Sequence, residues 1–180
     1  MPVTRSTPRA DALDSTLGML QAGEPISLES AARAAGLTKP GLMYHFPTKE
    51  ALMLALVDHV VDRCERAIVS RIGDPATATP QERAAAYATW SIEGPHDASE
   101  LVVFADPRLR DALVAQWGER LRPYVELPDD LDPDVRARLL AVRLLADGAW
   151  FACASGLFPP DEADRVRLQR TVDDLLGGIA

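Results

Sequence analysis

The two lysines of this 180-residue chain, Lys39 and Lys49, both lie in the stretch LTKPGLMYHFPTKE at residues 37–50. Four hydrogen-bond donors lie beside or between these lysines: Thr38, Tyr44, His45 and Thr48. Hydroxyl, imidazole and ammonium groups are donors that proteins use to hold the phosphate oxygens of nucleic acids. The stretch therefore has the chemistry of a phosphate-binding surface with a cation at each end.

Charge is unevenly distributed along the chain. The first 50 residues carry five basic and five acidic side chains, so the net charge of −8 arises entirely in residues 51–180. We therefore expect a polyanion to contact the first 50 residues rather than the acidic remainder. With 47% hydrophobic and 26% charged residues, the composition is that of a folded globular chain and excludes a disordered acidic one.

Helical spacing of apolar residues recurs along the whole chain and predicts an all-α protein of about nine helices. One stripe at four-residue intervals predicts a long helix over about residues 48–72: Leu52, Leu56, Val60, Cys64 and Ile68. The other predicted helices cover about residues 8–22, 28–34, 38–47, 80–92, 98–104, 133–155 and 161–176, with one more that opens at Asp106-Pro107.

The helices predicted at 28–34 and 38–47 are joined through Gly36 and pack on a preceding helix, which is the arrangement of a helix-turn-helix. Eight residues of helix rise roughly 12 Å, which fits a major groove about 12 Å wide. A cation at each end would fix such a helix on the phosphate backbone. Many three-helix packs never meet DNA, so a second interpretation stays open, with solvated lysines and core aromatics. Phe46 is predicted to be a core residue in either case.

The segment SLESAARAAGLTKPGLMYHFPTKEAL resembles the DNA-binding segment of the TetR/AcrR family of bacterial transcriptional regulators, and the match extends over about residues 9–56. The resemblance implies that six residues face DNA: Thr38, Lys39, Pro40, Tyr44, His45 and Lys49. Met43 stands where the family usually has Tyr, and Ala31 where a larger aliphatic residue is common. Pro40, Gly41 and Leu42 offer few polar atoms, so we expect sparse direct reading of bases.

The same resemblance implies a division into a helix-turn-helix DNA-binding domain, residues 1–50, and a helical domain for effector binding and dimerisation, residues 51–180. The helix at about 48–72 would connect them. We expect a ligand-responsive repressor whose homodimer binds a palindromic operator and is released by a small-molecule effector. The alternative is a helical module that binds a ligand or a protein and has lost specific DNA binding.

The segment Leu139–Gly156 is apolar on nearly all faces and resembles the family's Asp-Gly-x-Trp segment on an interface helix. We expect a dimer interface at Ala149, Trp150, Cys153, Val172 and Leu176. Arg143 and Asp147, four residues apart within the apolar run, are expected to pair. For the effector pocket, Trp90 and Trp117 are the candidate lining residues.

No catalytic motif, metal site or cofactor site is predicted. The one Glu-x-x-His pair, Glu93 with His96, contains Gly94-Pro95 and cannot place both side chains on one helix face. Cys64 and Cys153 are predicted to be buried thiols. Because we find neither a signal peptide nor an apolar run of membrane-spanning length, we expect a cytoplasmic protein with no membrane contact.

Overall fold

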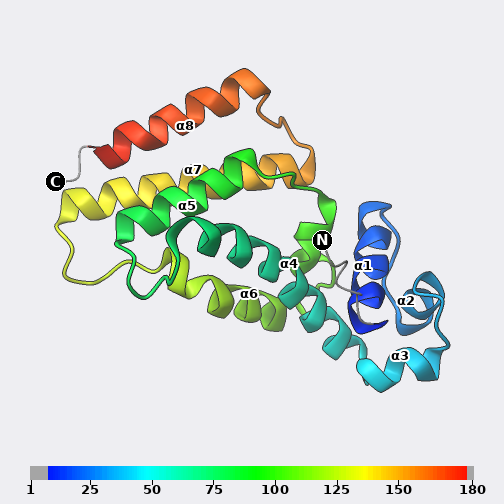
Figure 1. Ribbon diagram of the computed structural model, residues 1–180. Helices are drawn as coiled ribbons and strands as arrows, with labels where there is room; N and C mark the ends of the chain where they lie inside the picture. The colour runs from blue at the N-terminus through cyan, green and yellow to red at the C-terminus, as the bar shows by residue number, and fades with distance from the viewer. Residues whose placement is uncertain (1–7, 178–180) are drawn as a thin grey trace, which may run out of the picture. The chain divides into compact units, whose positions relative to one another are not determined.

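The structure is a computed structural model that describes residues 8–177 (Figure 1). Within that range the chain forms eight α-helices and one 3₁₀ helix and contains no strand, which confirms the all-α prediction. The helices are α1 (Pro8–Gln21), α2 (Leu28–Ala34), α3 (Lys39–His45), α4 (Lys49–Ile72), α5 (Pro80–Glu93), η1 (Ala98–Phe104), α6 (Arg110–Val125), α7 (Pro133–Ser155) and α8 (Glu162–Gly177). None of these helices is both long enough and apolar enough to cross a membrane.

Contacts group the chain into two compact units. The first unit joins residues up to Val60 with Ala98–Trp117, and the second joins Val61–Asp97 with residues from Gly118 on. Helices α4 and α6 therefore each contribute residues to both units. The predicted domain boundary after residue 50 stays a prediction. The segment 98–117 packs in the first unit, although it lies far beyond that boundary in sequence.

In the first unit, side-chain hydrogen bonds define the start of α2, and a glycine turn joins α2 to α3. The Ser27 hydroxyl accepts a hydrogen bond from the Ser30 backbone N–H at 3.0 Å, and the Ser30 hydroxyl accepts one from the Ser27 N–H at 2.9 Å. Gly36, with φ +66°, makes the turn between α2 and α3 in the left-handed conformation that glycine adopts without strain. Local sequence therefore sets the helix-turn-helix geometry.

The 3₁₀ helix η1 packs against α1 and completes the first unit. Val102 and Val103 of η1 and Leu113 of α6 are at most 3% exposed. Two polar pairs also hold α4: Gln116 donates to Asp58 at 2.7 Å, and His59 lies 2.6 Å from the Asp14 carboxylate of α1. The N-terminal half of α4 is thus fixed from two sides.

In the second unit, α5 packs against both α7 and α8 (Figure 1). Arg120 donates to Asp62 at 2.7 Å and to Glu65 at 2.7 and 3.0 Å, which ties α6 to α4. The predicted pair forms, with Arg143 donating to Asp147 at 2.9 Å. All five residues of the predicted α4 stripe are buried, which confirms that α4 contributes to the core of the fold.

Two local predictions need correction. The helix expected to open at Asp106-Pro107 begins instead at Arg110, because the Asp106 carboxylate accepts from the Arg108 backbone N–H at 2.9 Å and a turn forms first. Cys64 is fully buried as predicted, but the prediction that Cys153 is buried was wrong. Cys153 is partly exposed, and its Sγ accepts a hydrogen bond from the Arg165 guanidinium at 3.6 Å.

Candidate nucleic-acid interface

Helix α3 rests on two apolar side chains. Leu42 is 0% exposed and Phe46 is 1% exposed, so both face the core of the first unit, as predicted for Phe46. The Arg9 guanidinium of α1 lies 5.1 Å from the centre of the Phe46 ring, within the range of a cation–π contact. These contacts fix the orientation of α3 about its own axis and decide which of its side chains face solvent.

The opposite face of α3 is open to solvent. Tyr44 is 86% exposed and Met43 is 38% exposed, which are large fractions for residues of their size. Lys39 and Pro40 are exposed as well, and His45 is partly exposed with its ring edge-to-face against Tyr44 at 5.2 Å. Of the residues predicted to face DNA, those on α3 therefore share one accessible surface.

Two threonines cap the helices that begin on either side of this surface. The Thr38 hydroxyl accepts from the Gly41 backbone N–H at 3.2 Å, and the Thr48 hydroxyl accepts from the Ala51 N–H at 3.1 Å. Each hydroxyl uses an oxygen lone pair for the cap, so its own proton remains available to a phosphate oxygen. Thr38 is one of the predicted DNA-facing residues, and Thr48 has the same geometry at the start of α4.

Both lysines are paired with carboxylates. Lys39 pairs with Glu29 of α2, and Lys49 donates to Oδ2 of Asp106 at 2.6 Å. The hydrogen bond from Lys39 holds the pKa of Glu29 below its ordinary value, and the hydrogen bond from Lys49 does the same to the pKa of Asp106. Sequence analysis missed both acidic partners, because Asp106 comes 57 positions after Lys49 and no motif links them.

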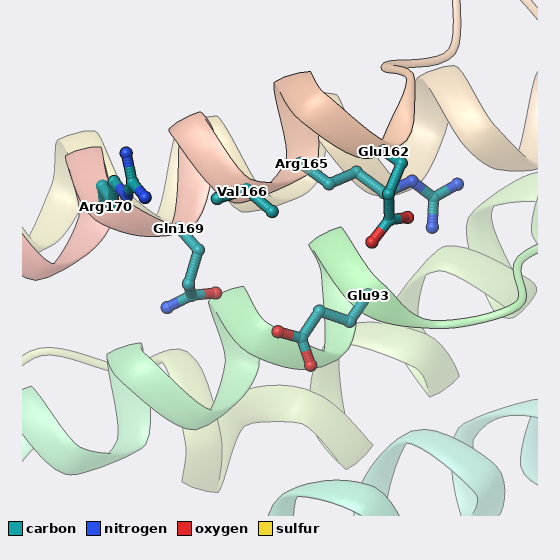
Figure 2. A pocket seen from close by; sticks show the side chains of 6 residues that line it. All are labelled: Glu93, Glu162, Arg165, Val166, Gln169 and Arg170. Atoms are coloured by element: carbon teal, nitrogen blue, oxygen red, sulfur yellow. The ribbon is translucent and has the colours of Figure 1, made fainter.

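The second unit contains a cavity of about 440 Å³ between α5 and α8, within the size range of small-molecule sites (Figure 2). Six residues line it: Glu93, Glu162, Arg165, Val166, Gln169 and Arg170. In Figure 2 the side chain of Gln169 reaches from α8 toward α5, where Glu93 lies. The lining is mostly polar and carries both signs of charge.

The two tryptophans predicted for an effector pocket fall in different compact units. Trp90 belongs to the second unit and is 8% exposed, with the His96 ring edge-to-face at 4.7 Å. Trp117 belongs to the first unit. Neither residue lines the α5–α8 cavity, and their role in ligand binding stays a prediction.

The residues predicted for a dimer interface differ in exposure. Ala149, Trp150 and Val172 are buried within the single chain, whereas Cys153 and Leu176 are partly exposed. Helix α7 presents other apolar side chains to solvent, namely Leu140 at 41%, Leu144 at 56% and Phe151 at 43% exposure. Sequence periodicity could not separate the two faces, because the helix is apolar on both.

Two family models match the chain. The model described as "Bacterial regulatory proteins, tetR family" matches residues 24–56, which include α2, α3 and the start of α4. The model described as "Tetracyclin repressor-like, C-terminal domain" matches residues 81–177, more than half of the chain. The chain belongs to the TetR family. The resemblance noted in residues 27–52 is thereby confirmed and extended to the C-terminal helices.

Curated relatives match a smaller region of the chain. The HTH-type transcriptional regulator EthR of Mycobacterium tuberculosis is 32% identical over 85 residues, which cover 42% of this chain and 39% of that regulator. EthR of Mycolicibacterium smegmatis is 35% identical over 57 residues, covering 29% of this chain and 26% of that protein. The matched part thus spans about two fifths or less of the length of these relatives.

Two solved structures share the fold over nearly the whole chain. A crystal structure described as a TetR-family transcriptional regulator from Rhodococcus sp. has a TM-score of 0.60 at 17% identity and covers 95% of this chain and 100% of its own. AibR in complex with isovaleryl coenzyme A and operator DNA has a TM-score of 0.57 at 19% identity, covering 94% and 98%. At these identities the likeness concerns the fold alone.

Proposed function

We propose that this TetR-family chain is a transcriptional regulator whose homodimer binds a palindromic operator as a repressor and is released by a small-molecule effector. The observation that carries the proposal is the surface of α3, which lies on Leu42 and Phe46, exposes Tyr44, and is flanked by the capped starts of two helices that each bring a lysine. Such a surface matches the donors that phosphates need.

The residues proposed to face DNA are Thr38, Lys39, Pro40, Tyr44, His45 and Lys49. Thr38 and Tyr44 would donate hydroxyl protons to phosphates, and the two lysines would supply charge. The exposed middle of α3 offers Pro40, Gly41 and Met43, which bring no side-chain donor to base edges. We therefore propose that the operator is recognised largely through DNA shape and through contact with thymine methyl groups.

The proposed dimer forms through the exposed face of α7. Leu140, Leu144 and Phe151 are spaced by four and seven residues, so they lie on one side of the helix, and Val166 of α8 is 45% exposed. An exposed apolar stripe of this kind on a chain of net charge −8 is typical of a protein–protein contact. A dimer is needed because one α3 contacts few base pairs and two half-sites must be read together.

We place the effector in the second unit, where the α5–α8 cavity has room for a small molecule. AibR, which shares the fold, was solved with isovaleryl coenzyme A, and this supports an effector site in a fold of this kind. A regulator of this type works in the cytoplasm, where its operator is, and we propose no catalytic activity for it.

Selection of bound duplexes from a random pool, followed by titration in increasing salt, tests the proposal. A regulator should enrich a palindromic sequence, and log K should fall steeply as log salt concentration rises, since phosphate contacts release counterions. Absence of binding at low salt, or binding indifferent to salt, would favour the alternative of a ligand- or protein-binding module. A screen for small molecules that release the selected duplex then tests the effector.

A further inference from the structure

The two lysines of the proposed DNA surface differ in how firmly their carboxylate partners are held. In the Lys39–Glu29 pair both side chains are well exposed, at 47% and 62%. Exposed pairs of long side chains are weak and are screened by salt, so Glu29 can turn into solvent when a phosphate arrives. This pair places little restraint on Lys39.

The Lys49–Asp106 pair is built differently. The Asp106 side chain is only 12% exposed, against 43% for Lys49. Its Oδ1 accepts from the Arg108 backbone N–H at 2.9 Å while its Oδ2 accepts from Lys49 at 2.6 Å. Because the turn over residues 106–109 fixes this carboxylate, Asp106 cannot swing away from the DNA surface as Glu29 can.

We propose that Asp106 is an internal competitor of DNA phosphate for Lys49 and thereby lowers the affinity of the protein for DNA. If Lys49 keeps its partner on binding, a phosphate on the same ammonium lies within about 6 Å of the carboxylate and is repelled by it. If Lys49 leaves, a carboxylate that is only 12% exposed loses its cation, which is unfavourable. In either case the affinity for DNA is lowered. The inference rests on the proposed function.

The test compares Asp106→Asn with the matched control Asp111→Asn. Asn keeps the shape and the Oδ1 acceptor for Arg108 but loses the charge. The control removes the same charge from an exposed residue in the first turn of α6. Binding to a selected duplex and to a scrambled duplex is measured by fluorescence anisotropy at several salt concentrations, with thermal denaturation to check that each variant is folded.

We expect D106N to bind both duplexes about tenfold more tightly at low salt, with a slope of log K against log salt that is steeper by up to about one, while D111N stays within about twofold of wild type. In a Lys49→Ala background D106N should give no gain. If the wild type binds DNA and D106N binds it equally well or more weakly, this inference alone is overturned. A wild type and a D106N variant that both fail to bind at low salt overturn the proposed function and this inference with it.

Discussion

The hydroxyl of Tyr87 on α5 donates a hydrogen bond of 2.8 Å to Oδ1 of Asp147 on α7. Arg143 occupies the other oxygen of the same carboxylate at 2.9 Å, so a buried tyrosine, a carboxylate and a guanidinium form one polar cluster between two packed helices. Burial, followed by the charge of Asp147, raises the pKa of Tyr87 well above its ordinary value of 10.0. The stability of the packing between α5 and α7 therefore depends on pH through the ionisation of Tyr87.

Replacing Tyr87 by Phe should lower the free energy of unfolding by about 1–2 kcal/mol near pH 8, because a hydrogen bond to a charged group is lost. In wild type the phenol ionises in the unfolded chain near pH 10 but in the folded chain only at higher pH. Its stabilising contribution is therefore complete below pH 10 and declines as pH rises through the folded pKa. Urea unfolding at pH 8 and pH 10.5 should show the gap between wild type and Y87F narrowing, and a widening gap would contradict the assignment.

Replacing Lys49 by Ala should weaken binding to specific and non-specific duplexes alike, by about tenfold at low salt, because a phosphate contact carries no sequence information. The salt slope should become shallower by about one. Arg138→Ala is the matched control, since it removes an exposed cation from α7 of the second unit. An unchanged affinity for K49A would remove Lys49 from the DNA surface.

Replacing Tyr44 by Phe separates binding from folding. Because the side chain is 86% exposed, the free energy of unfolding should stay within about 0.5 kcal/mol of wild type. Loss of the hydroxyl should nevertheless weaken DNA binding by about tenfold, as expected for a hydrogen bond to a charged phosphate. If Tyr44→Ala weakens binding and Y44F does not, the ring contacts DNA and the hydroxyl does not.

Replacing Leu144 by Glu should convert the proposed dimer into a monomer, because it places a charge in the exposed apolar stripe of α7. Val69→Glu on α4 is the control, since Val69 is also exposed, at 40%, but lies outside that stripe. Light scattering after size-exclusion chromatography measures the mass of each variant, and anisotropy measures operator binding. A dimeric L144E protein would direct attention to the partly exposed Cys153 and Leu176 instead.

The helices and the α3 surface could be predicted because their signals are local. Thr38 caps α3 and Thr48 caps α4, and each hydroxyl bonds a backbone N–H only three residues further along the chain. The apolar stripe of α4, with its four-residue spacing, follows from helix geometry. Phe46 was predicted to be buried for the same reason, since it follows α3 at the end of its apolar side. Local rules thus predict the helices that carry the side chains proposed to contact DNA.

The partners of these side chains could not be predicted, because they depend on packing between distant segments. Asp106 reaches Lys49 only because residues 98–117 pack in the first unit, and no sequence periodicity predicts that packing. Trp90 and Trp117 both looked like pocket residues, yet they belong to different compact units. On α7, composition alone could not show that Trp150 faces inward while Phe151 faces solvent.

The grouping of residues 98–117 with the first unit also bears on how the chain folds during synthesis. A chain that has emerged only as far as residue 72 has all of α1 to α4 but lacks η1, which packs against α1. Val102, Val103 and Leu113, all nearly inaccessible to water in the finished structure, would not yet have emerged from the ribosome. The unit that carries α3 therefore reaches its native packing only after Val61–Asp97 of the other unit has left the ribosome, and a fragment cut after α4 would display an uncovered apolar surface.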